Sequence, residues 1–112
     1  MKAGRVYYKG IEAGIITEVE EDELYRFQYL TSYLKRQDAQ PVSLSFPLRE
    51  DPYEKEILFP FFDGLIPEGW LLNIAISSWK INHLDRMELL LTCCHDCIGA
   101  VHVERIEEGE YV

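Results

Sequence analysis

The residues most suited to chemistry form one cluster near the end of the chain, Cys93-Cys94-His95-Asp96-Cys97. Thiolates and an imidazole are good zinc ligands. A zinc site, however, usually takes two spaced pairs of ligands from separate parts of a chain, and outside this cluster only His83 and His102 remain. Adjacent residues at a helix end do not converge on one tetrahedral centre without severe distortion. We therefore predict no metal and no other cofactor, and interpret the cysteines as small buried side chains at a helix end.

A cysteine nucleophile is the second chemistry that these residues could supply. Cys94 or Cys97 could meet His83 or His102 as a thiol–imidazole pair. The sequence offers no oxyanion site and no third group to orient the imidazole. We therefore predict no catalytic residues and no enzymatic activity.

Length and charge restrict the classes of function further. The chain has 112 residues, with 11 basic and 20 acidic side chains and a formal net charge of −9. This length predicts one domain, which we place at residues 1–107, with a polar tail at 108–112. An acidic surface repels phosphate backbones, so direct binding to nucleic acid is disfavoured.

The sequence also bears on the compartment. The N-terminus lacks the apolar region of a secretory signal, and no apolar stretch reaches the roughly 18 residues of a membrane span. The 3 closely spaced cysteines do not form an orderly disulfide framework, which favours free thiols in a reducing compartment. We expect a cytoplasmic protein without membrane contact.

The first thirty residues are typical of strands. Runs at 4–9 and 11–19 are separated by the turn signal Lys9-Gly10. In a third strand Tyr25, Phe27 and Tyr29 would share one face. This pattern predicts an antiparallel meander with one face in water.

The remaining elements are predicted from periodicity. Residues 31–36 indicate a short helix, and the alternation of Val42, Leu44, Phe46 and Leu48 predicts a strand over 41–48. The cluster of phenylalanines at 46 and 59–62 is interpreted as core. Helices are expected from Pro67 to about Lys80 and along the apolar stripe of 84–94, and residues 98–106 predict the last strand. The fold class is α+β, a small and mostly antiparallel sheet packed against a layer of short helices.

Three segments carry a family resemblance when taken together in this order: 41–48 (PVSLSFPL), 61–69 (FFDGLIPEG) and 96–101 (DCIGAV). They resemble the N-terminal subdomain of the HipA-type toxin kinases from about Gly4 to Glu107. No kinase motif can be placed in the chain, so it is most similar to the stand-alone HipS-type proteins of HipBST-type bacterial toxin–antitoxin systems. The resemblance implies an antitoxin that binds and neutralises a HipT-like serine/threonine kinase, encoded beside a HipB-like helix-turn-helix protein. Such a helix-turn-helix partner would supply any contact with DNA.

Trp70 is the leading candidate for contact with a partner. On the helix expected to begin near Pro67, Trp70 lies about 150° from the centre of the apolar sector, beside Asn73. A partly exposed tryptophan is a frequent hot spot in interfaces. Alternatively, Trp70 in the first helical turn packs back on Phe61, Phe62 or Tyr53.

Asp63, Glu68 and Gly69 complete the predicted partner-binding set with Trp70 and Asn73. The carboxylates could pair with basic groups of a partner, and Gly69, like Gly64, would allow a tight turn and close approach. The alternatives are surface solvation for the acids and turn geometry alone for the glycines. A second function remains open, that of an assembly or oligomerisation module of a kinase–repressor complex without direct inhibition.

Overall fold

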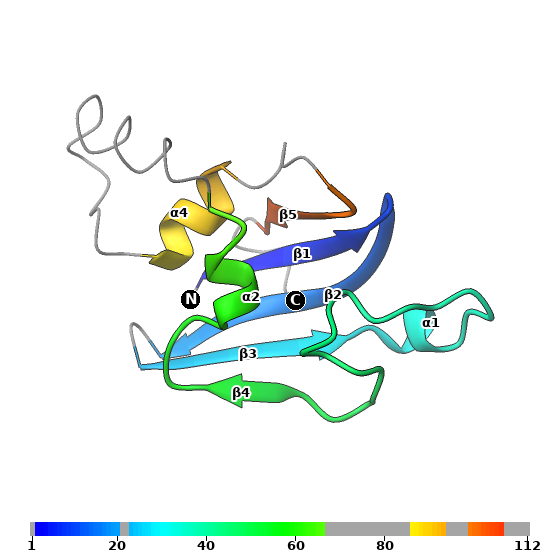
Figure 1. The fold of residues 1–112 in the computed structure, drawn as a ribbon. Coiled ribbons are helices and arrows are strands. Elements are labelled where there is room, and N and C mark those ends of the chain that lie inside the picture. Colours follow the sequence, from blue (N-terminus) through cyan, green and yellow to red (C-terminus); the bar gives the residue numbers. More distant parts are fainter. Residues whose placement is uncertain (1, 21–22, 67–85, 94–98, 107–112) are drawn as a thin grey trace.

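The computed structural model describes residues 2–20, 23–66, 86–93 and 99–106. Its strands form a sheet of order β4-β3-β2-β1-β5 in which every neighbouring pair is antiparallel (Figure 1). The strands are β1 (Lys2–Tyr8), β2 (Ile11–Glu20), β3 (Leu24–Tyr29), β4 (Tyr53–Lys55) and β5 (Val101–Arg105). The described helices are α1 (Thr31–Leu34), α2 (Pro60–Asp63) and α4 (Arg86–Cys93). The predicted α+β class is confirmed.

The turn between β1 and β2 follows from its two residues. Lys9 has φ 52° and Gly10 has φ 82°, so both adopt the left-handed conformation that a two-residue hairpin turn requires. The Lys9 N–H also donates to the carbonyl oxygen of Ala100 at 2.6 Å. The turn predicted from Lys9-Gly10 is therefore present, and it is tied to the residue before β5.

The alternation in β3 separates the two faces of the sheet as predicted. Tyr25, Phe27 and Tyr29 are at most 4% exposed and face the core. On the opposite face, Arg26 pairs with Glu54 of β4. One face of the sheet therefore supplies the core, and the other carries polar side chains.

The helix α4 covers the core face next to β1 and β5 (Figure 1). Its residues Met87, Leu90 and Leu91 are buried, which confirms the described part of the predicted apolar stripe. A Cβ at Gly4 of β1 would lie 2.7 Å from both Leu91 Cδ2 and Val103 Cγ1. A glycine at this position thus allows the helix and the two strands to approach closely.

The strand predicted over residues 41–48 is wrong. These residues form turns and loop, in which Val42 and Phe46 are buried but Leu44 is 99% exposed. The Phe46 N–H donates to the carbonyl oxygen of Ser43 at 3.0 Å, and this turn directs Leu44 outward. Pro41 at one end of the segment cannot donate to a strand ladder. The burial of Val42 and Phe46, four residues apart, is compatible with the alternation of a strand, although the segment is a loop.

The loop over residues 40–47 is held by tyrosine hydroxyls rather than by a neighbouring strand. The Tyr29 hydroxyl donates to the Phe46 carbonyl at 2.5 Å and accepts from the Val42 N–H at 3.0 Å. The Tyr33 hydroxyl donates to the Gln40 carbonyl at 2.7 Å. These bonds satisfy the Gln40 and Phe46 carbonyls and the Val42 N–H without a neighbouring strand.

The fourth strand along the chain is β4, at residues where no strand was predicted from the sequence. It pairs with β3 through Tyr25↔Lys55, Arg26↔Glu54 and Phe27↔Tyr53, and it forms an edge of the sheet.

The helices over the described ranges are all too short or too polar to span a membrane.

Candidate functional site

The predicted partner-binding corner begins at the end of α2. Asp63 is the last residue of this helix and is half-buried. The preceding Phe62 is fully buried, with its ring centroid 5.4 Å from that of Phe27 and 5.5 Å from that of Phe46. The core therefore fixes the position from which the chain enters the corner. Glu68, Gly69, Trp70 and Asn73 lie outside the described residues, so their predicted role stays a prediction.

Gly64 follows Asp63 and caps α2 in an ordinary right-handed conformation, with φ −69° and ψ −14°. The turn expected at this glycine is present, but its backbone conformation is one that other residues also adopt. What favours glycine is space, since a Cβ would lie 3.3 Å from the Pro60 carbonyl oxygen. The next turn continues to the buried Ile66, whose N–H donates to the Asp63 carbonyl at 3.2 Å. The chain is anchored up to the start of the corner.

The phenylalanine cluster is core, as predicted, with one half-exposed member. Phe46, Phe59 and Phe62 are at most 5% exposed, whereas Phe61 is half-buried. The Phe46 ring lies at the centre of this cluster, 5.2 Å from Phe59 and 5.1 Å from Tyr53 in edge-on contacts. Edge-on aromatic pairs contribute beyond their buried area. The cluster thus stabilises the edge of the sheet that β4 forms.

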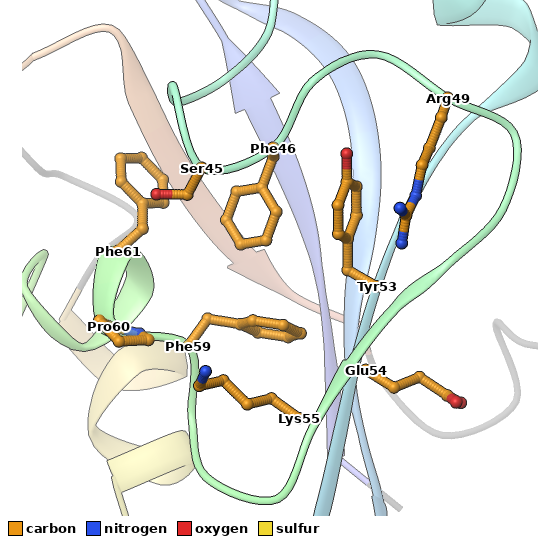
Figure 2. A pocket seen from close by; sticks show the side chains of 9 residues that line it. All are labelled: Ser45, Phe46, Arg49, Tyr53, Glu54, Lys55, Phe59, Pro60 and Phe61. Atoms are coloured by element: carbon orange, nitrogen blue, oxygen red, sulfur yellow. The ribbon is translucent and has the colours of Figure 1, made fainter.

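A pocket of about 350 Å³ opens at the margin of this cluster, and we name it the β4 pocket (Figure 2). Its lining residues come from three segments: Ser45, Phe46 and Arg49 of the loop, Tyr53–Lys55 of β4, and Phe59–Phe61 at the start of α2. The pocket was not expected from the sequence, because residues 41–48 were predicted to form a strand.

The charges of the β4 pocket are unusual for this acidic chain. The Arg49 guanidinium lies 3.6 Å from the centroid of the Tyr53 ring, and its nitrogens donate to the carbonyl oxygens of Asp51 and Pro52. Lys55 is exposed. The one carboxylate of the lining, Glu54, is held by Arg26 at 2.5 Å. The pocket therefore combines aromatic walls with two cations and a neutralised acid.

Burial perturbs one tyrosine near the pocket. Desolvation raises the pKa of Tyr29 to about 12, and the hydrogen bond from Val42 only partly opposes this increase. The hydroxyl therefore stays protonated at neutral pH and can donate to Phe46. The loop that forms one wall of the pocket is held in place under physiological conditions.

The candidate metal and nucleophile residues are only partly described. Across the described ranges, no three histidine, cysteine or acidic side chains are grouped to hold a metal ion. His102 on β5 stacks on Tyr7 with ring centroids 4.6 Å apart and lies 3.9 Å from Glu104. Cys93 ends α4, whereas His83, Cys94, His95 and Cys97 lie outside the described residues. The absence of a cofactor remains a prediction.

Comparison with known proteins places the chain in a family. The family model described as the HipA N-terminal domain matches residues 4–104. The chain belongs to the HipA N-terminal domain family. The match covers both the sheet and the loop that carries the β4 pocket.

A solved structure agrees with the family assignment. The structure titled "N-terminal domain of HipA toxin" superposes with a TM-score of 0.72 and 28% identity, covering 96% of this chain and 95% of that one. The family resemblance and the fold predicted from the sequence are thus confirmed.

Two curated relatives of this HipA N-terminal domain protein differ in length. A Haemophilus influenzae protein without a characterised function is 31% identical over 104 residues, which are 93% of this chain and 92% of the relative. A Sinorhizobium fredii protein that carries the name kinase Y4mE is 27% identical over 109 residues, and the chain spans only 26% of its length. The similarities to HipA are therefore to its N-terminal domain and not to a catalytic kinase part.

Proposed function

We propose that this HipA N-terminal domain protein is a non-catalytic antitoxin that binds a HipT-like serine/threonine kinase and neutralises it. The observation that carries the proposal is the family match over residues 4–104, together with the structural similarity to the N-terminal domain of a toxin. In the relative named kinase Y4mE, the matching region is part of a much longer chain. A domain of this kind is suited to occupy a surface of a kinase partner.

The proposed contact is the corner that follows α2. Trp70 is the anchor, because a large rigid side chain on the polar face of a helix buries much area on binding. Gly69 allows close approach, while Asp63, Glu68 and Asn73 form a polar rim around the anchor. The buried Phe62 supports this assignment, because it fixes the end of the helix from which the corner departs.

The proposed setting is the bacterial cytoplasm. The kinase and a HipB-like helix-turn-helix protein would join this chain in a larger complex. A formal net charge of −9 disfavours contact between this chain and phosphate backbones, so we assign DNA contact to the helix-turn-helix partner.

The test is a titration of the full chain into the kinase-like protein encoded beside it, with autophosphorylation as the readout. We expect saturable inhibition by the wild type. Trp70→Ala should weaken binding by more than about 1 kcal/mol while its circular dichroism spectrum and melting stay unchanged. Ser32→Ala, on the exposed surface of α1, is the matched control and should inhibit like the wild type.

Three results would contradict the proposal. A complex that forms while kinase activity is unchanged would assign the chain to assembly of the complex rather than to inhibition. If Trp70→Ala unfolds while Asn73→Ala does not, Trp70 belongs to the core and is not the anchor. An isolated chain that forms a stable homo-oligomer and leaves the kinase unbound would equally favour the assembly function.

A further inference from the structure

The β4 pocket is distinguished by its unneutralised positive charge. Five basic side chains of the described residues have a carboxylate partner: Lys2 and Arg105 with Glu88, Arg5 with Glu12, Arg26 with Glu54, and Arg36 with Asp38. Within the described ranges, neither Arg49 nor Lys55 forms an ion pair with a carboxylate. Both line the same pocket, in a chain whose net charge is −9. The pocket is therefore complementary to a negatively charged ligand.

The walls of the pocket are complementary to an apolar group. The rings of Phe46, Phe59 and Phe61 line it together with Tyr53, and the volume of about 350 Å³ lies at the lower end of the range for ligand pockets. In Figure 2, Lys55 runs below Phe59 toward Pro60, and Arg49 lies beyond Tyr53. The cations thus flank the aromatic rings. A matching ligand has one large apolar group between negative charges.

The position of the pocket indicates the form of this ligand. The strand β4 is an edge of the sheet, paired with β3 on one side only in the described part of the chain. An edge strand presents backbone groups that an extended peptide can pair with, while pockets beside the edge bind alternate side chains. A peptide segment can use both features at once, whereas a small molecule would use only the pocket.

The rim of the pocket is already ordered without a ligand. The Tyr53 hydroxyl donates to the Pro47 carbonyl at 2.5 Å, and Tyr29 holds Phe46 and Val42. A preorganised rim reduces the entropy cost of binding. Next to Ser45, the 99% exposed Leu44 stands on the turn and offers a further apolar contact outside the pocket.

We propose that the β4 pocket binds an extended segment of a partner protein that inserts one aromatic or large aliphatic side chain and places acidic residues on both sides of it. Arg49 and Lys55 attract the acidic residues, and the phenylalanine rings contact the central side chain. The lining of this pocket includes none of the residues of the proposed Trp70 contact, and the proposal does not rest on the proposed inhibition of a kinase.

The first test is amide NMR of the isotope-labelled full chain. The probe is a short blocked peptide with tryptophan at its centre and aspartate on both sides. A second peptide with lysine in place of aspartate is the control ligand. We expect saturable shifts for the amides of Lys55, Phe59 and Ser45 with the aspartate peptide only. Equal binding of the two peptides, or shifts confined to other parts of the chain, would overturn the proposal.

Two pairs of variants assign the binding to the pocket. Lys55→Glu should weaken binding of the aspartate peptide about fivefold, in the upper range for an exposed ion pair. Lys35→Glu, directly after α1, makes the same charge change elsewhere and should have no effect. Ser45→Trp fills the pocket and should abolish binding, whereas Ser32→Trp should not. The amide spectra establish that each variant is folded.

Two further results would also count against the β4 pocket as a peptide site. Unchanged affinity in both Lys55→Glu and Ser45→Trp would overturn the proposal even where the peptide binds. If ATP produces the same amide shifts at the same concentration, the ligand of the pocket is a nucleotide rather than a peptide, and the proposal is overturned. Because the readout is peptide binding, each of these results is independent of the kinase titration with Trp70→Ala.

Discussion

The hydroxyl of Tyr29 donates a 2.5 Å hydrogen bond to the backbone carbonyl of Phe46. This bond joins the last residue of β3 to a loop residue 17 positions later, and the same hydroxyl accepts from the Val42 N–H. This side chain therefore anchors the middle of the loop that forms a wall of the β4 pocket. Without it, two buried backbone groups would have no partner, and such groups are costly.

Replacing Tyr29 by phenylalanine tests this role. Tyr29→Phe keeps the ring in the core but leaves the Val42 N–H and the Phe46 carbonyl unsatisfied, so we expect a loss of about 2 kcal/mol in the free energy of unfolding. The measurement is urea denaturation. Tyr8→Phe is the control, because its hydroxyl donates to an exposed Gln40 side chain, and it should cost less than about 0.5 kcal/mol. Equal losses would contradict the role of Tyr29.

The pH dependence of stability provides a second prediction for Tyr29. Burial raises the pKa of its hydroxyl from 10.0 to about 12 in the folded chain. Below pH 10 the hydroxyl is protonated in both the folded and the unfolded chain, so its contribution to the free energy of unfolding is fully present. Above pH 10 the unfolded chain loses the proton first, so the free energy of unfolding falls as the pH rises toward about 12.

The comparison of wild type with Tyr29→Phe isolates this contribution from the other titrating groups. We expect the stability advantage of the wild type over the variant to be smaller at about pH 11 than at about pH 9. Urea denaturation at both values gives the two differences. An advantage that is constant or increases would show that the hydroxyl is not shielded from water.

The loop makes a third prediction, which distinguishes it from the strand expected from the sequence. Leu44→Ala should change stability by less than about 0.5 kcal/mol, because the side chain is 99% exposed. Phe46→Ala should cost about 3–5 kcal/mol, because its ring is 2% exposed at the centre of the aromatic cluster. Chemical denaturation measures both. A loss above about 2 kcal/mol for Leu44→Ala would mean that the segment buries Leu44 as a strand does.

The contrast between β3 and this loop shows what sequence patterns can predict. In β3 the alternation of Tyr25, Phe27 and Tyr29 follows from local pleating, so the period of two was sufficient to predict which side chains face the core. Val42 and Phe46 are held inward by a tyrosine distant in sequence: the Val42 N–H donates to the Tyr29 hydroxyl, which in turn donates to the Phe46 carbonyl. Periodicity contains no information about such a partner.

The residues of the candidate sites also divide into those that the sequence indicated and those that only the structure brings together. The family resemblance placed Asp63 at the corner that follows α2, and the structure shows that helix anchored by Phe62. Arg49 and Lys55 had no signal of their own, because each resembles any surface cation. Only the folded loop brings them to one pocket and leaves both without a carboxylate partner among the described residues.

The contact of Gly4 with α4 provides the fourth prediction. A Cβ at this position would lie 2.7 Å from Leu91 Cδ2 and Val103 Cγ1, so Gly4→Ala must displace the helix or the neighbouring strand. We expect a cost of about 1–3 kcal/mol, the usual range for overpacking. Thermal and urea denaturation measure this cost.

A double-mutant cycle identifies the atoms that cause it. Leu91→Ala removes the Cδ2 atom that the new Cβ would meet, so Gly4→Ala should cost at least about 0.5 kcal/mol less in that background. Leu90→Ala is the matched control, because Leu90 is equally buried but is not among the nearest neighbours of that Cβ, and there the cost should be unchanged. An equal reduction with both leucines would indicate general loosening of the core. A cost that neither leucine changes would place the conflict at Val103, and the close approach of α4 would then not be what requires glycine.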